Sequence, residues 1–122
     1  MTIKSIAFTM YPVIDMARAR RFYEETLGLH AAREFEGQWV EYDLDGGTFA
    51  LANMVVYGLT PSATSGGSIG FEVEDVDDLV TTLKRKGTTI KLEPLSTPVC
   101  RMAVVLDPEG NAITLHQVTH AW

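Results

Sequence analysis

The sequence contains one pattern twice, and this internal repeat limits what the chain can fold into. The segment VIDMARARRFYEETLG begins at Val13, and the segment VEDVDDLVTTLKRKG begins at Val73. Each reads Val-x-Asp, then a helical pattern, then glycine. The two aspartates, Asp15 and Asp75, are separated by about half of the 122-residue chain. A repeat of this length favours two copies of one supersecondary unit.

Both aspartates stand where a helix should begin. An Asp side chain at the N-cap accepts hydrogen bonds from the free N–H groups of the first turn. After Asp75, apolar residues recur at i, i+3, i+4 and i+7 from Val76 to Leu83, which is typical of an amphipathic helix. Gly28 and Gly87 should end the two helices.

One strand-like segment precedes each expected helix and three follow it, so each half has the order β-α-β-β-β. The expected strands are residues 5–13, 32–36, 38–44 and 48–54 in the first half, and 68–74, 88–92, 101–106 and 112–118 in the second. The segments DGG at 45–47 and DPEG at 107–110 are expected hairpin turns.

The sequence therefore predicts an α+β fold of two paired βαβββ modules in a single domain, 1–122. Module one covers about 1–56, a linker rich in Gly, Ser, Thr and Pro covers about 57–67, and module two covers about 68–122. One helix covers a sheet on one face only. We therefore expect a curved mixed sheet with the helices outside and a cleft inside, and sheet edges that favour a homodimer.

Composition and charge narrow the function classes. The net charge is −6, whereas binding to a phosphate backbone needs a basic patch, so we expect no nucleic-acid partner. No apolar run approaches the ~20 residues of a membrane span, and the N-terminus lacks a signal-peptide core. The expectation is a cytoplasmic protein without a membrane partner. Cys100 is the single cysteine, which excludes an intrachain disulfide.

Strand parity predicts which side chains face the cleft, because successive residues of a strand point to opposite sides of the sheet. The bulky apolar residues of the strands at 68–74 and 112–118 should pack under the helix. The residues left for the cleft are Ser68, Gly70, Glu72, Ala112, Thr114 and His116. Aligning the two halves pairs Phe8 with Ser68, Met10 with Gly70, Ala50 with Thr114 and Ala52 with His116.

His116 and Glu72 are the candidates for catalysis. A neutral imidazole near a carboxylate is suited to act as a general base around neutral pH. The alternatives for His116 are a ligand contact and a purely structural hydrogen bond.

Two further groups of side chains are candidates for ligand binding. If Val40 and Leu44 pack under the helix, Trp39 and Glu41 face the cleft, where an aromatic wall with one carboxylate suits a small amphipathic or cationic ligand. The alternative for Trp39 is the core or a dimer interface. Arg101 could hold an anionic ligand group through its forked guanidinium, or form a salt bridge at the rim.

Three segments resemble, in order and spacing, the vicinal oxygen chelate superfamily: YPVIDMARARRFYEETLGL, IGFEVEDVDDLVTTLKRKG and DPEGNAITLHQ. This superfamily includes glyoxalase I, extradiol dioxygenases, fosfomycin resistance enzymes and bleomycin resistance proteins. The resemblance covers essentially the whole chain. It implies paired βαβββ modules, usually in a homodimer, and in metal-dependent members a divalent cation held by His, Gln or Glu on the first and last strands.

The resemblance places Phe8, Ala50, Ser68 and Thr114 at the metal-ligand positions. Phenylalanine and alanine have no donor atom, and a neutral hydroxyl is a poor ligand compared with imidazole or carboxylate. We therefore predict no metal and no other cofactor at this site.

The sequence thus predicts metal-independent binding of a small organic ligand in the inter-module cleft, resembling sequestration by bleomycin resistance proteins. The expected ligand-binding residues are Phe8, Met10, Trp39, Glu41, Ala50, Ser68, Arg101 and Thr114. The alternative is an enzyme of the glyoxalase or lyase, isomerase or dioxygenase class. It would use His116 and Glu72 for acid–base chemistry, or a shifted metal site at Glu41, Glu72 and His116.

Overall fold

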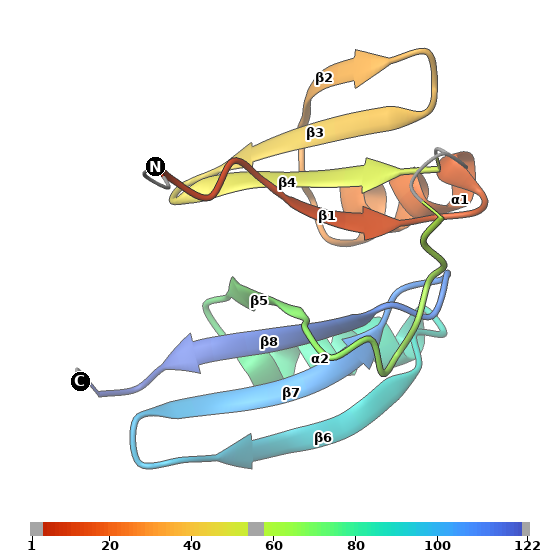
Figure 1. Cartoon of the computed structure of the whole chain (residues 1–122). Coiled ribbons are helices and arrows are strands. Elements are labelled where there is room, and N and C mark those ends of the chain that lie inside the picture. The colour runs from red at the N-terminus through yellow and green to blue at the C-terminus, as the bar shows by residue number, and fades with distance from the viewer. Residues whose placement is uncertain (1–3, 54–57, 121–122) are drawn as a thin grey trace. The chain divides into compact units, whose positions relative to one another are not determined.

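The computed structural model describes residues 4–53 and 58–120. The chain divides into two compact units, Met1–Pro61 and Ser62–Trp122, and each contains one βαβββ module (Figure 1). The boundary falls inside the segment predicted to be a linker. The α+β class and the paired modules are confirmed, and the described strands belong to two four-stranded mixed sheets, one in each module.

The sheet of module one contains β1 (Thr9–Pro12), β2 (Ala31–Phe35), β3 (Trp39–Leu44) and β4 (Gly47–Ala52) in the order β1-β4-β3-β2. Strand β1 is parallel to β4, and the other pairs are antiparallel. Helix α1 (Met16–Arg20) is capped by Asp15, whose Oδ1 accepts from the N–H of Arg18 at 3.0 Å. The N-cap prediction is confirmed here.

Helix α1 continues into a π-helical segment, η1 (Arg21–Thr26), that the sequence did not predict. The N–H of Leu27 donates to the carbonyl of Phe22 at 2.9 Å. The acceptor lies five residues before the donor, instead of the four of an α-helix. The wider turn allows the adjacent residues Phe22 and Tyr23 both to be buried. Tyr23 packs against Tyr42 and Phe49 of the sheet. Core packing of two neighbouring aromatic rings therefore outweighs regular α-helical hydrogen bonding at this point.

Module two repeats the arrangement. It contains β5 (Ile69–Glu72), α2 (Val76–Arg85), β6 (Ile90–Ser96), β7 (Cys100–Leu106) and β8 (Ala112–Val118), with the sheet order β5-β8-β7-β6. In each module of Figure 1 the helix lies against one face of its own sheet. The apolar stripe of α2 supplies the core, because Val76, Val80 and Leu83 are buried together with Ile113 and Leu115 of β8.

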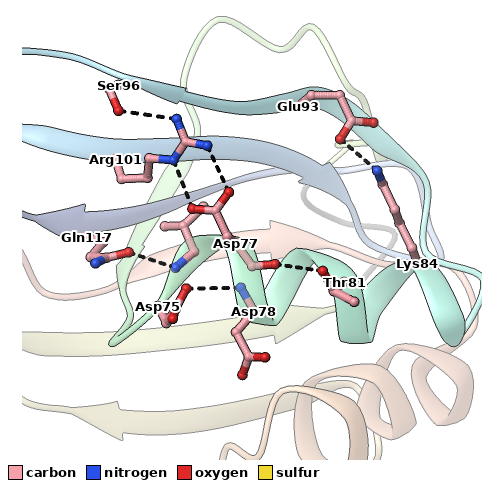
Figure 2. Close-up of polar contacts among 10 residues, drawn as sticks. Asp75, Asp77, Asp78, Thr81, Lys84, Glu93, Ser96, Arg101 and Gln117 are labelled. Atoms are coloured by element: carbon pink, nitrogen blue, oxygen red, sulfur yellow. Dashed lines mark hydrogen bonds and ion pairs between the residues drawn. The ribbon is translucent and has the colours of Figure 1, made fainter.

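Helix α2 is fixed to the strands beneath it by polar contacts at its first turn (Figure 2). Oδ1 of Asp75 accepts from the N–H of Asp78 at 3.0 Å, which confirms the second N-cap. The N–H of Val76 donates to Oε1 of Gln117 on β8 at 2.9 Å. These bonds satisfy donors that the first turn of a helix leaves free, and they orient the helix on the sheet.

Strand β6 differs from the sequence prediction. It begins at Ile90 and extends to Ser96, beyond the expected end at Leu92, and it contains Pro94. Its register with β7 shifts between Ile90 and Leu92 and again between Leu92 and Leu95. An edge strand with such irregularities tolerates a proline, because the missing N–H need not pair with a neighbour.

In the part of the chain that the structure covers, residues 4–53 and 58–120, no helix has the length and apolar character needed to cross a bilayer.

Candidate functional site

The two modules use the same strand register at their centres. Met10 of β1 lies opposite Ala50 of β4, and Gly70 of β5 lies opposite Thr114 of β8. The alignment of the repeat made from the sequence therefore corresponds to equivalent places in the two sheets. Two residues farther along each strand, module one has the pair Pro12 and Ala52. Module two has Glu72 and His116 at the equivalent place.

Burial agrees with the parity argument for the residues expected under the helices, whereas Ala50 and Ala52, expected on the cleft face, are buried as well. Phe49 and Leu51 in module one, and Ile113 and Leu115 in module two, are at most 1% exposed on the helix side. Val40 and Tyr42 are also fully buried. Leu44 was expected under the helix but is 38% exposed, because it lies at the end of β3 next to the turn.

The side chains at the superfamily's metal-ligand positions do not fit a divalent cation. In module two the hydroxyls of Ser68 and Thr114 lie 3.4 Å apart and pair with each other. In module one Phe8 and Ala50 offer no donor, and the Phe8 ring meets Trp39 edge-on with 5.0 Å between centroids. Zinc needs several imidazole, thiolate or carboxylate donors, and calcium needs six to eight oxygens, mainly from carboxylates and carbonyls, so two hydroxyls beside two apolar side chains are chemically unsuited.

The Ser68–Thr114 pair lines an open depression of about 540 Å³ in module two. This volume is in the range of known small-molecule sites. Most of the lining is small or apolar, and Lys91 contributes a charged group. The lining residues are Ala63, Thr64, Ser65, Gly66, Gly67, Ser68, Lys91, Leu92, Val104, Ala112 and Thr114.

The segment at 62–67 is held as a wall of the depression by two bonds. Oδ1 of Asn111 accepts from the N–H of Ser62 at 3.1 Å, and Nζ of Lys91 donates to the carbonyl of Ala63 at 2.8 Å. Asn111 is itself fixed by the carboxylate of Asp107, which accepts from its N–H at 2.9 Å and from its Nδ2 at 3.1 Å. The DPEGN segment therefore has a structural function, which is to attach the loop to the sheet.

His116 and Glu72, the two residues that the sequence proposed for acid–base chemistry, form a hydrogen-bonded pair. Nδ1 of His116 lies 2.6 Å from Oε1 of Glu72, and Oε2 of Glu72 accepts from the N–H of Val118 at 2.8 Å. The backbone N–H of Val118, and then His116, lower the pKa of the Glu72 carboxyl below its ordinary value. The pair is accessible to solvent, since the side chains are 35% and 56% exposed.

Glu41 is engaged within module one. Its Oε1 accepts from Nε of Arg33 at 2.6 Å, and its Oε2 accepts from Nε1 of Trp39 at 2.8 Å. The indole hydrogen bond, followed by Arg33, lowers the pKa of Glu41. Trp39 and Glu41 are thus neighbours, as expected, and Trp39 also contacts Phe8. Within residues 4–53 and 58–120 no three His, Cys, Asp or Glu side chains gather as a metal-binding group.

Arg101 lies apart from the other candidates. It shares its strand face with Ala103 and Val105, which are buried on the helix side. Its Nε and one terminal nitrogen donate to the two carboxylate oxygens of Asp77 at 2.9 and 2.8 Å (Figure 2). The ion pair that the sequence left as the alternative is the contact present in the structure, and its partner is the first turn of α2.

Sequence reasoning missed Lys91, Leu92 and Val104 as lining residues. Val104 could have been found, because it lies opposite Thr114 in the β7–β8 register. Lys91 and Leu92 could not, because the register shifts of β6 break the alternation from which strand faces are predicted.

Comparison with known proteins agrees with this geometry. The family model described as Glyoxalase/Bleomycin resistance protein/Dioxygenase superfamily matches residues 5–115. A search of curated proteins gave no match.

Solved structures with the same fold include three informative relatives. A glyoxalase-related enzyme from Fulvimarina pelagi is 16% identical with a TM-score of 0.80, and 98% of this chain and 100% of that chain are covered. TnmS3, an antibiotic binding protein from Streptomyces sp. CB03234, is 26% identical with a TM-score of 0.75, covering 98% and 99%. Lactoylglutathione lyase from Agrobacterium tumefaciens is 18% identical with a TM-score of 0.74, covering 96% of both chains.

Because the family model spans nearly the whole chain and both modules have the matching topology, this protein belongs to the Glyoxalase/Bleomycin resistance protein/Dioxygenase superfamily.

Proposed function

We propose that this protein binds a small organic ligand without a metal ion, on the sheet face of module two that carries Ser68 and Thr114. One observation carries the proposal. The two residues at the superfamily's metal-ligand positions in this module are a mutually bonded hydroxyl pair, and both line a depression of about 540 Å³. The site therefore offers volume and hydrogen bonds in place of metal donors.

The lining suits a largely apolar molecule with a few polar groups. Leu92, Val104 and Ala112 supply apolar surface, and the hydroxyls of Ser68 and Thr114 supply hydrogen bonds. Small-molecule sites usually combine such an apolar surface with a small number of orienting polar groups. The likeness to TnmS3, an antibiotic binding protein, supports a sequestering role in which the ligand is held without being transformed.

The proposal is tested by thermal-shift and calorimetric titration of the metal-stripped protein. The probes are 2-naphthol as a small aromatic, bleomycin as a glycopeptide and S-hexylglutathione as a thiol conjugate. We expect at least one probe to raise the melting temperature equally in the presence and absence of EDTA, since no ion takes part. Binding that appears only after nickel, zinc, cobalt or manganese is added would show that the proposal is wrong.

A second candidate function is acid–base catalysis, and the 2.6 Å contact between His116 and Glu72 is the observation that favours it. A carboxylate that orients an imidazole is a recurring arrangement for a general base. The variant His116→Ala separates the two functions once a ligand is known. Lost turnover with retained affinity would support an enzyme, whereas a ligand recovered chemically unchanged from the wild-type protein supports sequestration.

A further inference from the structure

The segment at residues 62–67, called the strap below, forms one wall of the depression. We propose that the strap is a movable wall, which regulates entry to the depression and is held closed by the contact between Lys91 and Ala63. This inference rests on the proposed function, because a movable wall matters only where a ligand enters. It makes Lys91 a positioning residue, which acts on a ligand through the strap.

The strap reaches from one edge of the sheet of module two to the other. Strands β6 and β5 are the two edges in the order β5-β8-β7-β6. Ala63 contacts Lys91 on β6, whereas the chain enters β5 at Ile69. Strands β6, β7 and β8 each add one apolar residue to the same lining, namely Leu92, Val104 and Ala112. A change in the position of the strap therefore changes the width of the depression.

The two ends of the strap are fixed. At one end the N–H of Ser62 donates to Oδ1 of Asn111 at 3.1 Å, and Asn111 is buried and bonded to the carboxylate of Asp107. At the other end the chain enters β5 at Ile69, which is paired with Ile113 of β8. Buried hydrogen bonds and a strand pairing are costly to break, so movement is confined to the residues between these ends.

Between the ends, one contact ties the strap to β6. Nζ of Lys91 donates to the carbonyl of Ala63 at 2.8 Å, and this bond is exposed to solvent. Among the residues that the structure describes, the hydroxyls of Ser62 and Ser65 bond only within the strap. A single exposed hydrogen bond favours the closed position by only roughly three- to tenfold, so the strap can open without unfolding of the module.

The backbone of the strap is suited to such a movement. Residues 64–67 are exposed, and Gly66 has a φ of +95°, a conformation that residues with a side chain rarely adopt. Gly67 follows directly. Glycine rotates over a wider range of φ and ψ than other residues, and hinges are short segments that absorb such changes. The glycine pair therefore provides a pivot between the contact at Ala63 and the fixed strand β5.

The experiment measures entry to the depression without any ligand. In a Cys100→Ser background, Val104→Cys places a single thiol on the lining. Its alkylation rate is measured with iodoacetamide, which is small, and with N-(1-pyrenyl)maleimide, which is bulky. The ratio of the bulky to the small rate reports the width of the entrance, because a changed pKa of the thiol affects both reagents alike. Adding Lys91→Met should raise this ratio roughly threefold or more, since the contact with Ala63 is lost.

Three controls separate the strap from other effects. Lys91→Arg keeps a donor at this position and should restore the low ratio. Lys84→Met removes another exposed ammonium that contacts β6, 2.8 Å from Oε1 of Glu93, and should leave the ratio unchanged. A thiol from Val118→Cys, at a 52% exposed position outside the depression, should react alike with and without Lys91→Met.

A second measurement follows the strap directly. In Lys91→Met with no introduced thiol, ¹⁵N relaxation should give lower order parameters for the amides of residues 64–67 than in the wild type. The amide of Ser62 should keep its value, because its bond to Asn111 remains. Ala112→Cys offers a second thiol position on the lining if Val104→Cys does not fold, and thermal denaturation checks each variant.

The outcomes separate this inference from the proposed function. An unchanged ratio in Lys91→Met would overturn the inference alone, because the strap would then not control entry. A raised ratio that Lys91→Arg fails to restore would overturn it too, since the hydrogen bond would not be the cause. Failure of 2-naphthol, bleomycin and S-hexylglutathione to bind would instead contradict the proposed function, while the alkylation ratio still decides whether the strap moves.

Discussion

The hydroxyls of Ser68 and Thr114 lie 3.4 Å apart and pair with each other across β5 and β8. These residues occupy two positions at which metal-dependent relatives are expected to place imidazole or carboxylate donors. The affinity of this site for a divalent ion should therefore be low, because two neutral hydroxyls cannot offset the dehydration of the ion.

We therefore expect the protein to lose added metal. After incubation with nickel, zinc, cobalt or manganese and dialysis, elemental analysis should find far less than one ion per chain. The double variant Ser68→His with Thr114→Glu places two strong donors side by side and should retain more metal than the wild type. Stoichiometric metal in the wild type, lost in Glu72→Gln or His116→Ala, would instead establish the shifted site.

The turn at residues 107–111 should matter for stability. Asp107 is 4% exposed, and its carboxylate accepts from the N–H groups of Glu109 and Asn111 and from Nδ2 of Asn111. Asp107→Ala leaves these donors unmatched and should lower the free energy of unfolding by about 2–3 kcal/mol, measured by urea denaturation.

The matched control for Asp107 is Asp45, an exposed residue in the equivalent turn of module one. Asp45→Ala should change the free energy of unfolding by less than about 0.5 kcal/mol. Equal effects of the two substitutions would show that the buried hydrogen bonds of the second turn contribute little.

The Glu72 carboxyl should titrate below its ordinary pKa of 4.5, because the N–H of Val118 and the ring of His116 favour its ionised form. A lowered pKa in the folded state stabilises the fold above pH 4.5, and this contribution is lost as the pH falls through the lowered value. NMR titration of the side-chain carboxyl carbon measures the shift directly.

The same effect should be measurable as a pH dependence of the unfolding free energy. The stability difference between wild type and Glu72→Gln should shrink in the acid range below pH 4.5, and Glu74→Gln, at an exposed neighbouring residue, should follow the wild type. An ordinary or raised pKa for Glu72 would contradict the bonding described for this pair.

Arg101 should contribute to the attachment of helix α2 rather than to ligand binding. Its guanidinium forms a forked pair with Asp77, and the two side chains are 31% and 55% exposed. Arg101→Ala should cost less than about 1 kcal/mol of stability, the usual value of a solvent-exposed ion pair. It should leave the affinity for any ligand that binds the opposite face unchanged. A large loss of affinity, absent in the control Arg85→Ala, would restore Arg101 as an anchor.

Dimerisation remains a prediction from the sequence. Each described sheet has two edge strands, β1 and β2 in module one and β5 and β6 in module two, and edges favour pairing or cover by another chain. Analytical ultracentrifugation should give twice the 13.5 kDa of one chain. A single 13.5 kDa species at micromolar concentration would count against it.

Much of the fold could be predicted because the same pattern of strand, helix and turn residues occurs twice in the sequence, so each half supports the prediction for the other. The N-caps Asp15 and Asp75, the order of helix and strands along each half, and the position of Thr114 on the sheet face away from the buried Ile113 and Leu115 follow from local hydrogen-bonding chemistry and strand alternation. The π-helical turn at Arg21–Thr26 could not be predicted, because it depends on aromatic rings of β3 and β4 that pack against Tyr23.

The two modules, the superfamily resemblance and the absence of strong metal donors could all be predicted from the residues alone, since residue identity decides which atoms can coordinate. The positions without strong donors are Phe8, Ala50, Ser68 and Thr114. The hydrogen-bond partners required the folded chain: Glu72 for His116, Asp77 for Arg101, and the hydroxyl pair at the depression. Hydrogen bonds depend on distances between strands that are far apart in the sequence. Those distances exist only once the register of β5, β7 and β8 has been fixed by packing of the core.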